Sequence, residues 1–161
     1  MIIYHVGPGF EPKTLKEFWL VQSILMSYYG LHDDRWKAST GAWKLVKERT
    51  DGLLFLDSGA HSLYTREVMK KKHREGYDFY KTKEFWKYVD AYAVFVKKYR
   101  KFVDNYVNVD VIFNPQMSWE VLKYLETEHG LNPIPVIHYG SGERWVHKHL
   151  EAGYTYLGIG G

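Results

Sequence analysis

The sequence predicts an α/β fold in which parallel (β/α) units form the first part of a (β/α)8 barrel, truncated after about five strands. Short apolar runs alternate with longer amphipathic segments, the pattern of β/α units. The run Leu53–Leu56 is apolar at every position, which is typical of a strand buried on both faces of a parallel sheet. The last apolar run, 154–159, has no helix-forming segment after it. A complete small α/β domain is the alternative.

Each predicted element has a local signal. Thr14 and Glu17 form a capping box and Gly30 is placed as a C-terminal glycine, so a helix is expected between them. Residues at three- and four-residue spacing make Lys83–Phe102 the clearest helix. Strands are expected at 2–6, 53–56, 107–113, 134–138 and 154–159. Helices are expected at 14–29, 34–48, 83–102, 118–128 and 143–152.

The composition is that of one globular domain, residues 1–161, with no linker. Hydrophobic residues make up 45% and charged residues 25% of its 161 positions. The net charge of +3 permits a nucleic-acid partner but does not require one. Cysteine is absent, which excludes disulfides and thiolate metal sites from these residues. No apolar run approaches the ~20 residues of a membrane span, and the N-terminus lacks signal-peptide features, so we expect no membrane partner and a cytoplasmic location.

Chemistry-bearing residues stand where the predicted strands end. The carboxyl ends of parallel strands converge on one edge of the sheet, so these residues are expected to be neighbours. A carboxylate, a carboxamide, imidazoles and backbone N–H groups beside glycines suit a polar planar ligand. The strand ends carry His5-Val6-Gly7, Asp57-Ser58-Gly59, Asn114-Pro115, His138-Tyr139-Gly140 and Gly158-Ile159-Gly160-Gly161.

Four motifs in order resemble a known family. They are Leu56-Asp57-Ser58-Gly59-Ala60, Val109-Asp110-Val111-Ile112-Phe113, Pro135-Val136-Ile137-His138-Tyr139-Gly140 and Leu157-Gly158-Ile159-Gly160-Gly161. Over residues 53–161 they resemble the first part of the tRNA-guanine transglycosylases (queuine and archaeosine tRNA-ribosyltransferases), especially the relatives that insert 7-deazaguanines into DNA. The resemblance implies a TIM (β/α)8 barrel and a pentosyltransferase that exchanges guanine for a 7-deazaguanine derivative in DNA or tRNA. It also implies host cytoplasm as the location if the chain is phage-encoded.

The resemblance also implies roles for particular residues. Asp57 matches the general acid/base, and Ser58, Gly59, Asp110 and His138 fall among the residues that bind the base. Further substrate-binding positions are Asn114, Tyr139, Gly160 and Gly161. The carboxylate nucleophile and the zinc site of the family would lie beyond residue 161, so no cofactor is expected in this chain and a second polypeptide is a candidate partner.

The sequence departs from the tRNA-acting members at three positions. Asn114 stands where they carry an Asp that accepts hydrogen bonds from guanine. An amide both donates and accepts, so the base preference is open. His61 and Tyr139 replace an aromatic residue and a polar amide.

Structural roles compete with these assignments. Asp57 fits the cap of a following turn or helix equally well, and Asn114-Pro115 is favoured as a turn opener. A buried, hydrogen-bonded ring is the favoured interpretation of His138. Asp110, inside a predicted strand, requires a partner because a buried unpaired carboxylate is costly.

Two longer patterns also have alternative interpretations. The aromatic stripe from Phe85 to Tyr99 is favoured as core over a base-stacking surface. The basic clusters 70–74 and 97–101 are typical of solvated helix faces. The alternative is that they contact a phosphate backbone, which requires them to lie beside the strand ends.

Three functional hypotheses remain. The first is base exchange at a site completed outside this chain. The second is a non-catalytic remnant of the fold that binds a nucleic acid or a partner protein. The third is another TIM-barrel enzyme that uses Asp57. Whether the chain is itself an enzyme stays open.

Overall fold

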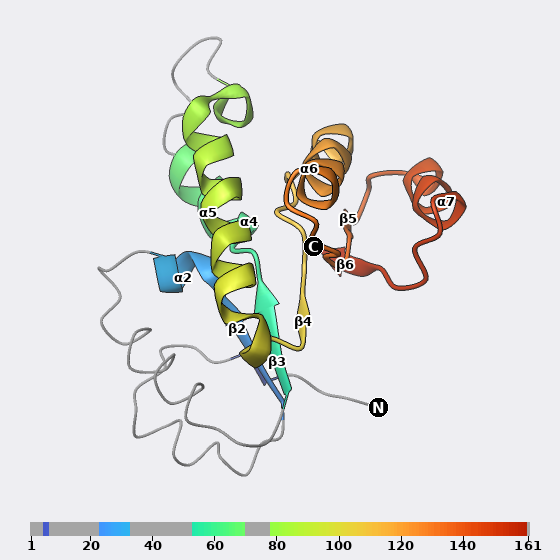
Figure 1. Cartoon of the computed structure of the whole chain (residues 1–161). Helices are drawn as coiled ribbons and strands as arrows, with labels where there is room; N and C mark the ends of the chain where they lie inside the picture. Colours follow the sequence, from blue (N-terminus) through green and yellow to red (C-terminus); the bar gives the residue numbers. More distant parts are fainter. Residues whose placement is uncertain (1–4, 7–22, 33–52, 70–77, 161) are drawn as a thin grey trace.

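The computed structural model describes residues 5–6, 23–32, 53–69 and 78–160, and Figure 1 shows their arrangement. The strands are β1 (His5–Val6), β2 (Ser23–Ser27), β3 (Leu53–Asp57), β4 (Asn105–Tyr106), β5 (Val136–His138) and β6 (Gly158–Gly160). The helices are α2 (Tyr28–His32), α4 (Ala60–Leu63), α5 (Lys83–Tyr99), α6 (Pro115–Thr127) and α7 (Glu143–Glu151). A π-helical segment, Tyr64–Met69, extends α4, and 3-10 turns Phe79–Lys81 and Arg100–Phe102 flank α5.

All described strands are parallel and follow one another in chain order. One sheet has the order β1-β2-β3-β4 and a second pairs β5 with β6. A single parallel bridge between Val107 and Ile134 joins the two sheets. Among the described strands the order therefore never reverses, in contrast to a doubly wound sheet.

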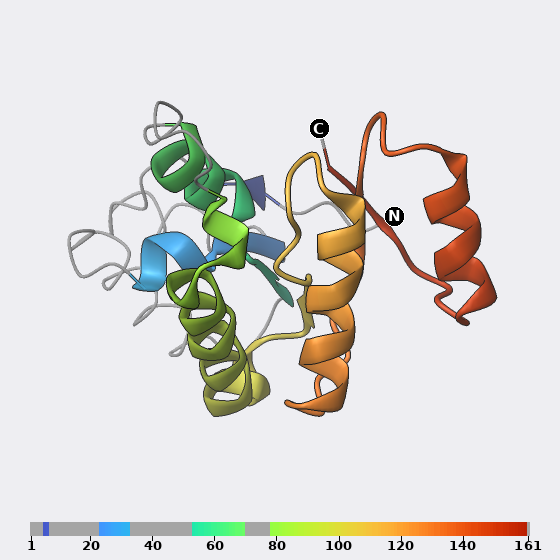
Figure 2. The same ribbon diagram turned by 90° about the horizontal axis from the view of Figure 1, so that it is seen from above.

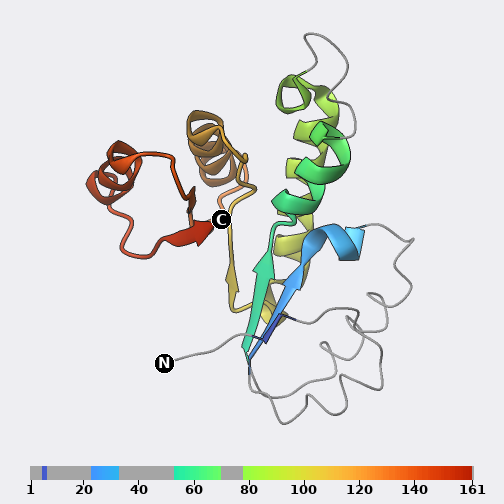
Figure 3. The ribbon, with the colours of Figure 1, turned by 180° about the vertical axis from the view of Figure 1, so that it is seen from behind.

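The helices cover one face of the strands. Figure 1 shows α5 in front of β2 and β3, and Figure 2 shows α5 and α6 side by side. Figure 3, from the opposite side, shows β2 and β3 with no described helix in front of them. Among the described helices, α5 thus lies on one side of β2 and β3.

The segment Ser23–Ser27 corrects the sequence prediction. We expected it inside a helix spanning 14–29, but it forms β2, paired with β3 in the register Ile24↔Leu54 and Met26↔Leu56. Ile24 and Met26 are buried on one face, the alternation of a strand. Pairing on both sides of β2 overrode a local helical pattern.

Other boundaries also differ from the prediction. Gly30 does not end a helix but lies inside α2. The predicted strand 107–113 is displaced, because β4 is Asn105–Tyr106 and only Val107 makes a further bridge. The helix predicted from residue 118 begins at Pro115. Residues 2–4, 14–22 and the predicted helix 34–48 lie outside the described residues.

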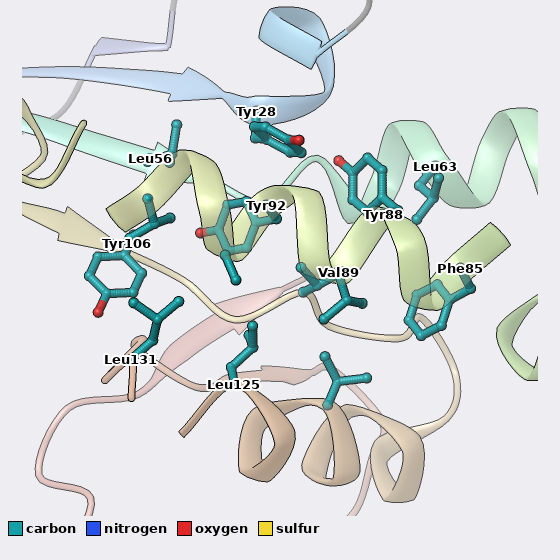
Figure 4. Close-up of a cluster of buried hydrophobic side chains, with 14 of the residues drawn as sticks. Tyr28, Leu56, Leu63, Phe85, Tyr88, Val89, Tyr92, Tyr106, Leu125 and Leu131 are labelled. Atoms are coloured by element: carbon teal, nitrogen blue, oxygen red, sulfur yellow. The ribbon is translucent and has the colours of Figure 1, made fainter. Parts of the chain in front are cut away.

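The predicted aromatic stripe is core. In α5, six side chains are buried beneath the sheet, and Figure 4 shows several of them against Tyr28 and Leu56. Complete burial of one such side chain stabilises the fold by about 1.5–3 kcal/mol. The buried residues of α5 are Phe85, Tyr88, Val89, Tyr92, Ala93 and Val96.

No helix in the described part of the chain has both the length and the apolar character needed to cross a membrane.

Candidate active site at the strand ends

Asp57 is the last residue of β3 and closes the turn that follows it. The backbone N–H of Gly59 donates to Asp57 Oδ2 at 2.9 Å. Gly59 has φ 78°, and a Cβ at this position would lie 2.3 Å from Tyr29 Cβ, so the turn requires glycine. The capping role that competes with catalysis is therefore present in the structure. It occupies one carboxylate oxygen of Asp57.

The surroundings of Asp57 favour its protonated form. Burial raises the pKa of the Asp57 carboxyl group, and the negative charge of Asp110 raises it further. The hydrogen bond from the Gly59 N–H opposes this shift but does not cancel it. Asp57 is thus a carboxyl group that holds its proton to higher pH than an exposed one, as a general acid requires.

Asp110 connects the end of β3 to the end of β5. Its carboxylate is 7% exposed. Oδ2 of Asp110 lies 2.5 Å from His138 Nε2, and Oδ1 accepts a longer bond of 3.4 Å from Ser58 Oγ. The partner that a buried carboxylate requires is therefore His138, with Ser58 as a second donor.

The ring of His138 packs against the backbone of Gly160. These two residues are opposite each other in the β5–β6 register. A Cβ at Gly160 would lie 3.0 Å from both Nδ1 and Cε1 of His138. Any other residue at position 160 would therefore displace the ring.

The structure thus brings together Ser58, Asp110, His138 and Gly160 around the turn that holds Asp57. The side chains of two predicted substrate-binding residues, Asn114 and Tyr139, are exposed and form no hydrogen bond with this cluster of described residues. Asn114 is exposed and caps α6, accepting a 3.0 Å hydrogen bond from the Met117 N–H through Oδ1. Tyr139 is 89% exposed, although its N–H donates to the Gly160 carbonyl at 2.8 Å. Gly161 lies outside the described residues.

Sequence reasoning missed two aromatic residues near the strand ends. Tyr88 of α5 donates a 2.6 Å hydrogen bond to the carbonyl oxygen of Ser58. The sequence signal that could have identified Tyr88 is a tyrosine at a core position where phenylalanine would fit. A buried tyrosine hydroxyl normally has a hydrogen-bond partner, so its presence indicates a polar group nearby. Phe113, expected in a strand, has φ 62° and is 79% exposed, with its ring edge-on to Tyr64 at 5.8 Å. No pattern in the sequence indicated that exposure.

The basic cluster 97–101 is not beside these residues. Its end passes through the turn Arg100–Phe102, and Asp104 then bonds to Leu54, near the start of β3. Asp57 is at the other end of the same strand. Residues 70–74 of the other cluster lie outside the described part of the chain.

Within the described residues, no three His, Cys, Asp or Glu side chains are grouped as a metal site would need. No protein-family model matches the chain, and comparisons with curated proteins and with solved structures found no match.

Proposed function

We propose that this chain is part of a base-exchange transglycosylase that replaces guanine by a 7-deazaguanine derivative in DNA or tRNA. The observation that carries the proposal is the hydrogen-bonded group Ser58–Asp110–His138 beside Asp57, at the carboxyl ends of parallel strands. These residues come from three of the four motifs that resemble the transglycosylases, and Gly160 comes from the fourth.

The arrangement of the elements supports the same proposal. Parallel strands in chain order, with helices on one side, are what the first part of a (β/α)8 barrel requires. In such barrels the active site lies at the carboxyl ends of the strands. Asp57 occupies that position at the end of β3.

In this proposal Asp57 exchanges a proton with the reacting base, because its pKa is raised by burial. Asp110, His138, Ser58 and Gly160 form the polar wall against which the planar base lies. Attack on the sugar carbon requires a second carboxylate as nucleophile, supplied by residues outside this chain. The partners are then a nucleic acid, a 7-deazaguanine base and a second polypeptide in the cytoplasm.

One observation favours the second candidate, a non-catalytic remnant that only binds nucleic acid. Asp57 and Asp110 are the carboxylates at the described strand ends, and Asp110 is already held by His138 and Ser58. The described residues therefore offer no free carboxylate for covalent attack in addition to Asp57.

The test is incorporation of a radiolabelled 7-deazaguanine base into DNA and into tRNA by the purified chain and by its complex with any polypeptide that copurifies. Asp57→Asn is expected to abolish incorporation. The control is Asp90→Asn on α5, which should leave incorporation unchanged because its amide oxygen can still accept the hydrogen bond from Tyr124. Undiminished exchange by Asp57→Asn would remove its catalytic role.

The alternatives give different results in the same experiment. Salt-dependent binding of nucleic acid without incorporation would favour the remnant. A protein that binds neither DNA nor tRNA at low salt would favour an enzyme acting on a small molecule.

A further inference from the structure

We propose that Phe113 is a base-stacking residue, whose exposed ring holds an unstacked nucleobase of the acceptor nucleic acid beside the candidate active site. The inference rests on the proposed function, because that function supplies a nucleic acid as the acceptor. It deepens that function by assigning how the acceptor is held, whereas the polar residues described above are assigned to the exchanged base.

Phe113 occupies a backbone position that favours glycine or asparagine. The Asn114 N–H donates to the Val111 carbonyl oxygen at 3.0 Å, which closes a four-residue turn with Phe113 at its third position. Phe113 has φ 62°, and among the described residues it is the one non-glycine with positive φ. A bulky side chain is strained in this conformation, and such strain is characteristic of binding and catalytic sites. The chain therefore has phenylalanine where glycine would be less strained.

The ring of Phe113 lies largely outside the core. The residue is 79% exposed. Its ring contacts that of Tyr64, the first residue of the π-helical segment, with 5.8 Å between the centroids and 78° between the planes. At that angle Tyr64 covers at most one face of the Phe113 ring. Because the residue is so exposed, the other face is open to a flat ligand.

Phe113 stands close to the candidate active site. It follows Asp110 by three residues, so the two Cα atoms are at most about 11 Å apart. The Asp110 carboxylate is bonded to His138 and Ser58, which places Phe113 at the same edge of the strands. Tyr139, next to His138 and 89% exposed, is a second exposed aromatic residue after a strand end.

An unstacked nucleobase is the ligand that suits this ring. An enzyme that reacts at a base takes that base out of the stack, which uncovers the faces of the neighbouring bases. An aromatic side chain binds such a face whatever the base, because every base has a π face. The exchanged base is assigned to the buried polar residues around Asp57. The exposed ring of Phe113 is therefore assigned to the acceptor strand.

The first test measures binding of fluorescein-labelled single-stranded DNA and tRNA to the full chain and to its complex with any copurifying polypeptide. Phe113→Ala and Phe113→Leu should weaken binding by about 5- to 100-fold, the loss expected for stacking on one base. Phe113→Tyr keeps the flat ring and should bind like the unchanged chain. Tyr156→Ala is the control, because Tyr156 is 66% exposed but precedes the amino end of β6. Full affinity in Phe113→Ala, or an equal loss in Phe113→Tyr, would overturn the proposal.

Two further measurements distinguish stacking from a role in folding or in phosphate binding. Phe113→Gly relieves the backbone strain, so its Tm should be no lower than that of the unchanged chain although it binds as weakly as Phe113→Ala. The slope of log affinity against log salt concentration should be the same in Phe113→Ala and the unchanged chain, because stacking releases no counterions. A lower Tm in Phe113→Gly would assign the ring to folding, and a smaller slope would assign it to positioning a phosphate contact. Either result contradicts the proposal.

Photocrosslinking locates the contact directly. Single-stranded DNA with 5-iodouracil in place of thymine should crosslink to the peptide that contains Phe113, as mapped by mass spectrometry, and the crosslink should be lost in Phe113→Ala. If Phe113→Ala instead dissociates a copurifying polypeptide and leaves nucleic-acid binding unchanged, the ring belongs to a protein interface and the proposal is wrong.

The outcomes separate this inference from the proposed function. Binding that is weakened in Phe113→Ala, without base exchange by the unchanged chain or its complex, would retain the role of Phe113 and overturn the transglycosylase. Exchange with the same rate and affinity in Phe113→Ala would overturn the role of Phe113 alone. Absence of nucleic-acid binding by the unchanged chain and its complex would overturn both.

Discussion

The hydroxyl of Tyr88 donates a 2.6 Å hydrogen bond to the carbonyl oxygen of Ser58. Tyr88 is buried on α5, and Ser58 directly follows Asp57. The core helix therefore holds the backbone of the turn at which the candidate acid stands. Burial raises the pKa of Tyr88 well above its usual value, and the charges of Asp57 and Asp110 add to this effect, so its hydroxyl remains a donor.

Tyr88→Phe is expected to lower the free energy of unfolding by about 1–3 kcal/mol, because the Ser58 carbonyl loses its buried donor. Chemical denaturation of the two proteins measures the difference. Tyr156→Phe is the control, because Tyr156 is 66% exposed and should lose almost nothing. Equal stability of Tyr88→Phe and the unchanged chain would show that water replaces the bond.

Asp57→Asn is expected to stabilise the protein at neutral pH. The folded state raises the pKa of Asp57, so between the unfolded value and the folded value the folded chain holds more protons than the unfolded chain. Stability of the unchanged protein therefore falls as pH rises through this window, and the asparagine variant escapes that loss. Near pH 3 residue 57 is uncharged in both proteins, so the difference in stability between them should vanish.

Thermal unfolding at pH 3 and pH 7 measures this effect, since each kcal/mol corresponds to about 2–4 °C in Tm for a chain of this size. A variant that is less stable at pH 7 than the unchanged protein would show that the charged Asp57 contributes to folding. A gain in stability with loss of exchange is the result expected of a functional residue.

Gly59→Ala is expected to destabilise the protein more than Gly153→Ala does. Both glycines have positive φ, which costs an alanine about 1–2 kcal/mol. At Gly153 the Cβ would enter open space, whereas at Gly59 it would lie 2.3 Å from Tyr29 Cβ and 2.8 Å from Tyr29 N. The measurement is the difference between the two unfolding free energies. Similar values would mean that α2 shifts away without cost.

Asn114→Ala and Asn114→Asp distinguish a cap from a base-reading residue. Alanine removes the acceptor for the Met117 N–H and should cost about 0.5–2 kcal/mol, whereas aspartate keeps it and should cost little. If Asn114 only caps α6, exchange by the aspartate variant should match that of the unchanged chain. A changed preference between guanine and other bases in Asn114→Asp would assign Asn114 to the site.

The sequence predicted best where a periodic pattern ran along a whole element. The helix expected at 83–102 forms α5, Lys83–Tyr99, and the stripe beginning at Phe85 is buried as expected. It predicted worst at Ser23–Ser27, because five residues are too few for their period to distinguish a strand from the end of a helix. Pairing with β1 and β3 decided that segment.

For the site, the sequence by itself placed Asp57, His138 and Gly160 at strand ends, because each of these apolar runs stops at a polar residue or a glycine. It did not determine that Asn114 caps a helix, because Asn114-Pro115 is favoured as a turn opener and the helix is expected only from residue 118. Only the tertiary structure decided that Asp110 binds His138 and Ser58, residues 28 and 52 positions away along the chain. Such a contact depends on how separate strands are placed next to one another, and no local pattern of residues encodes that distance.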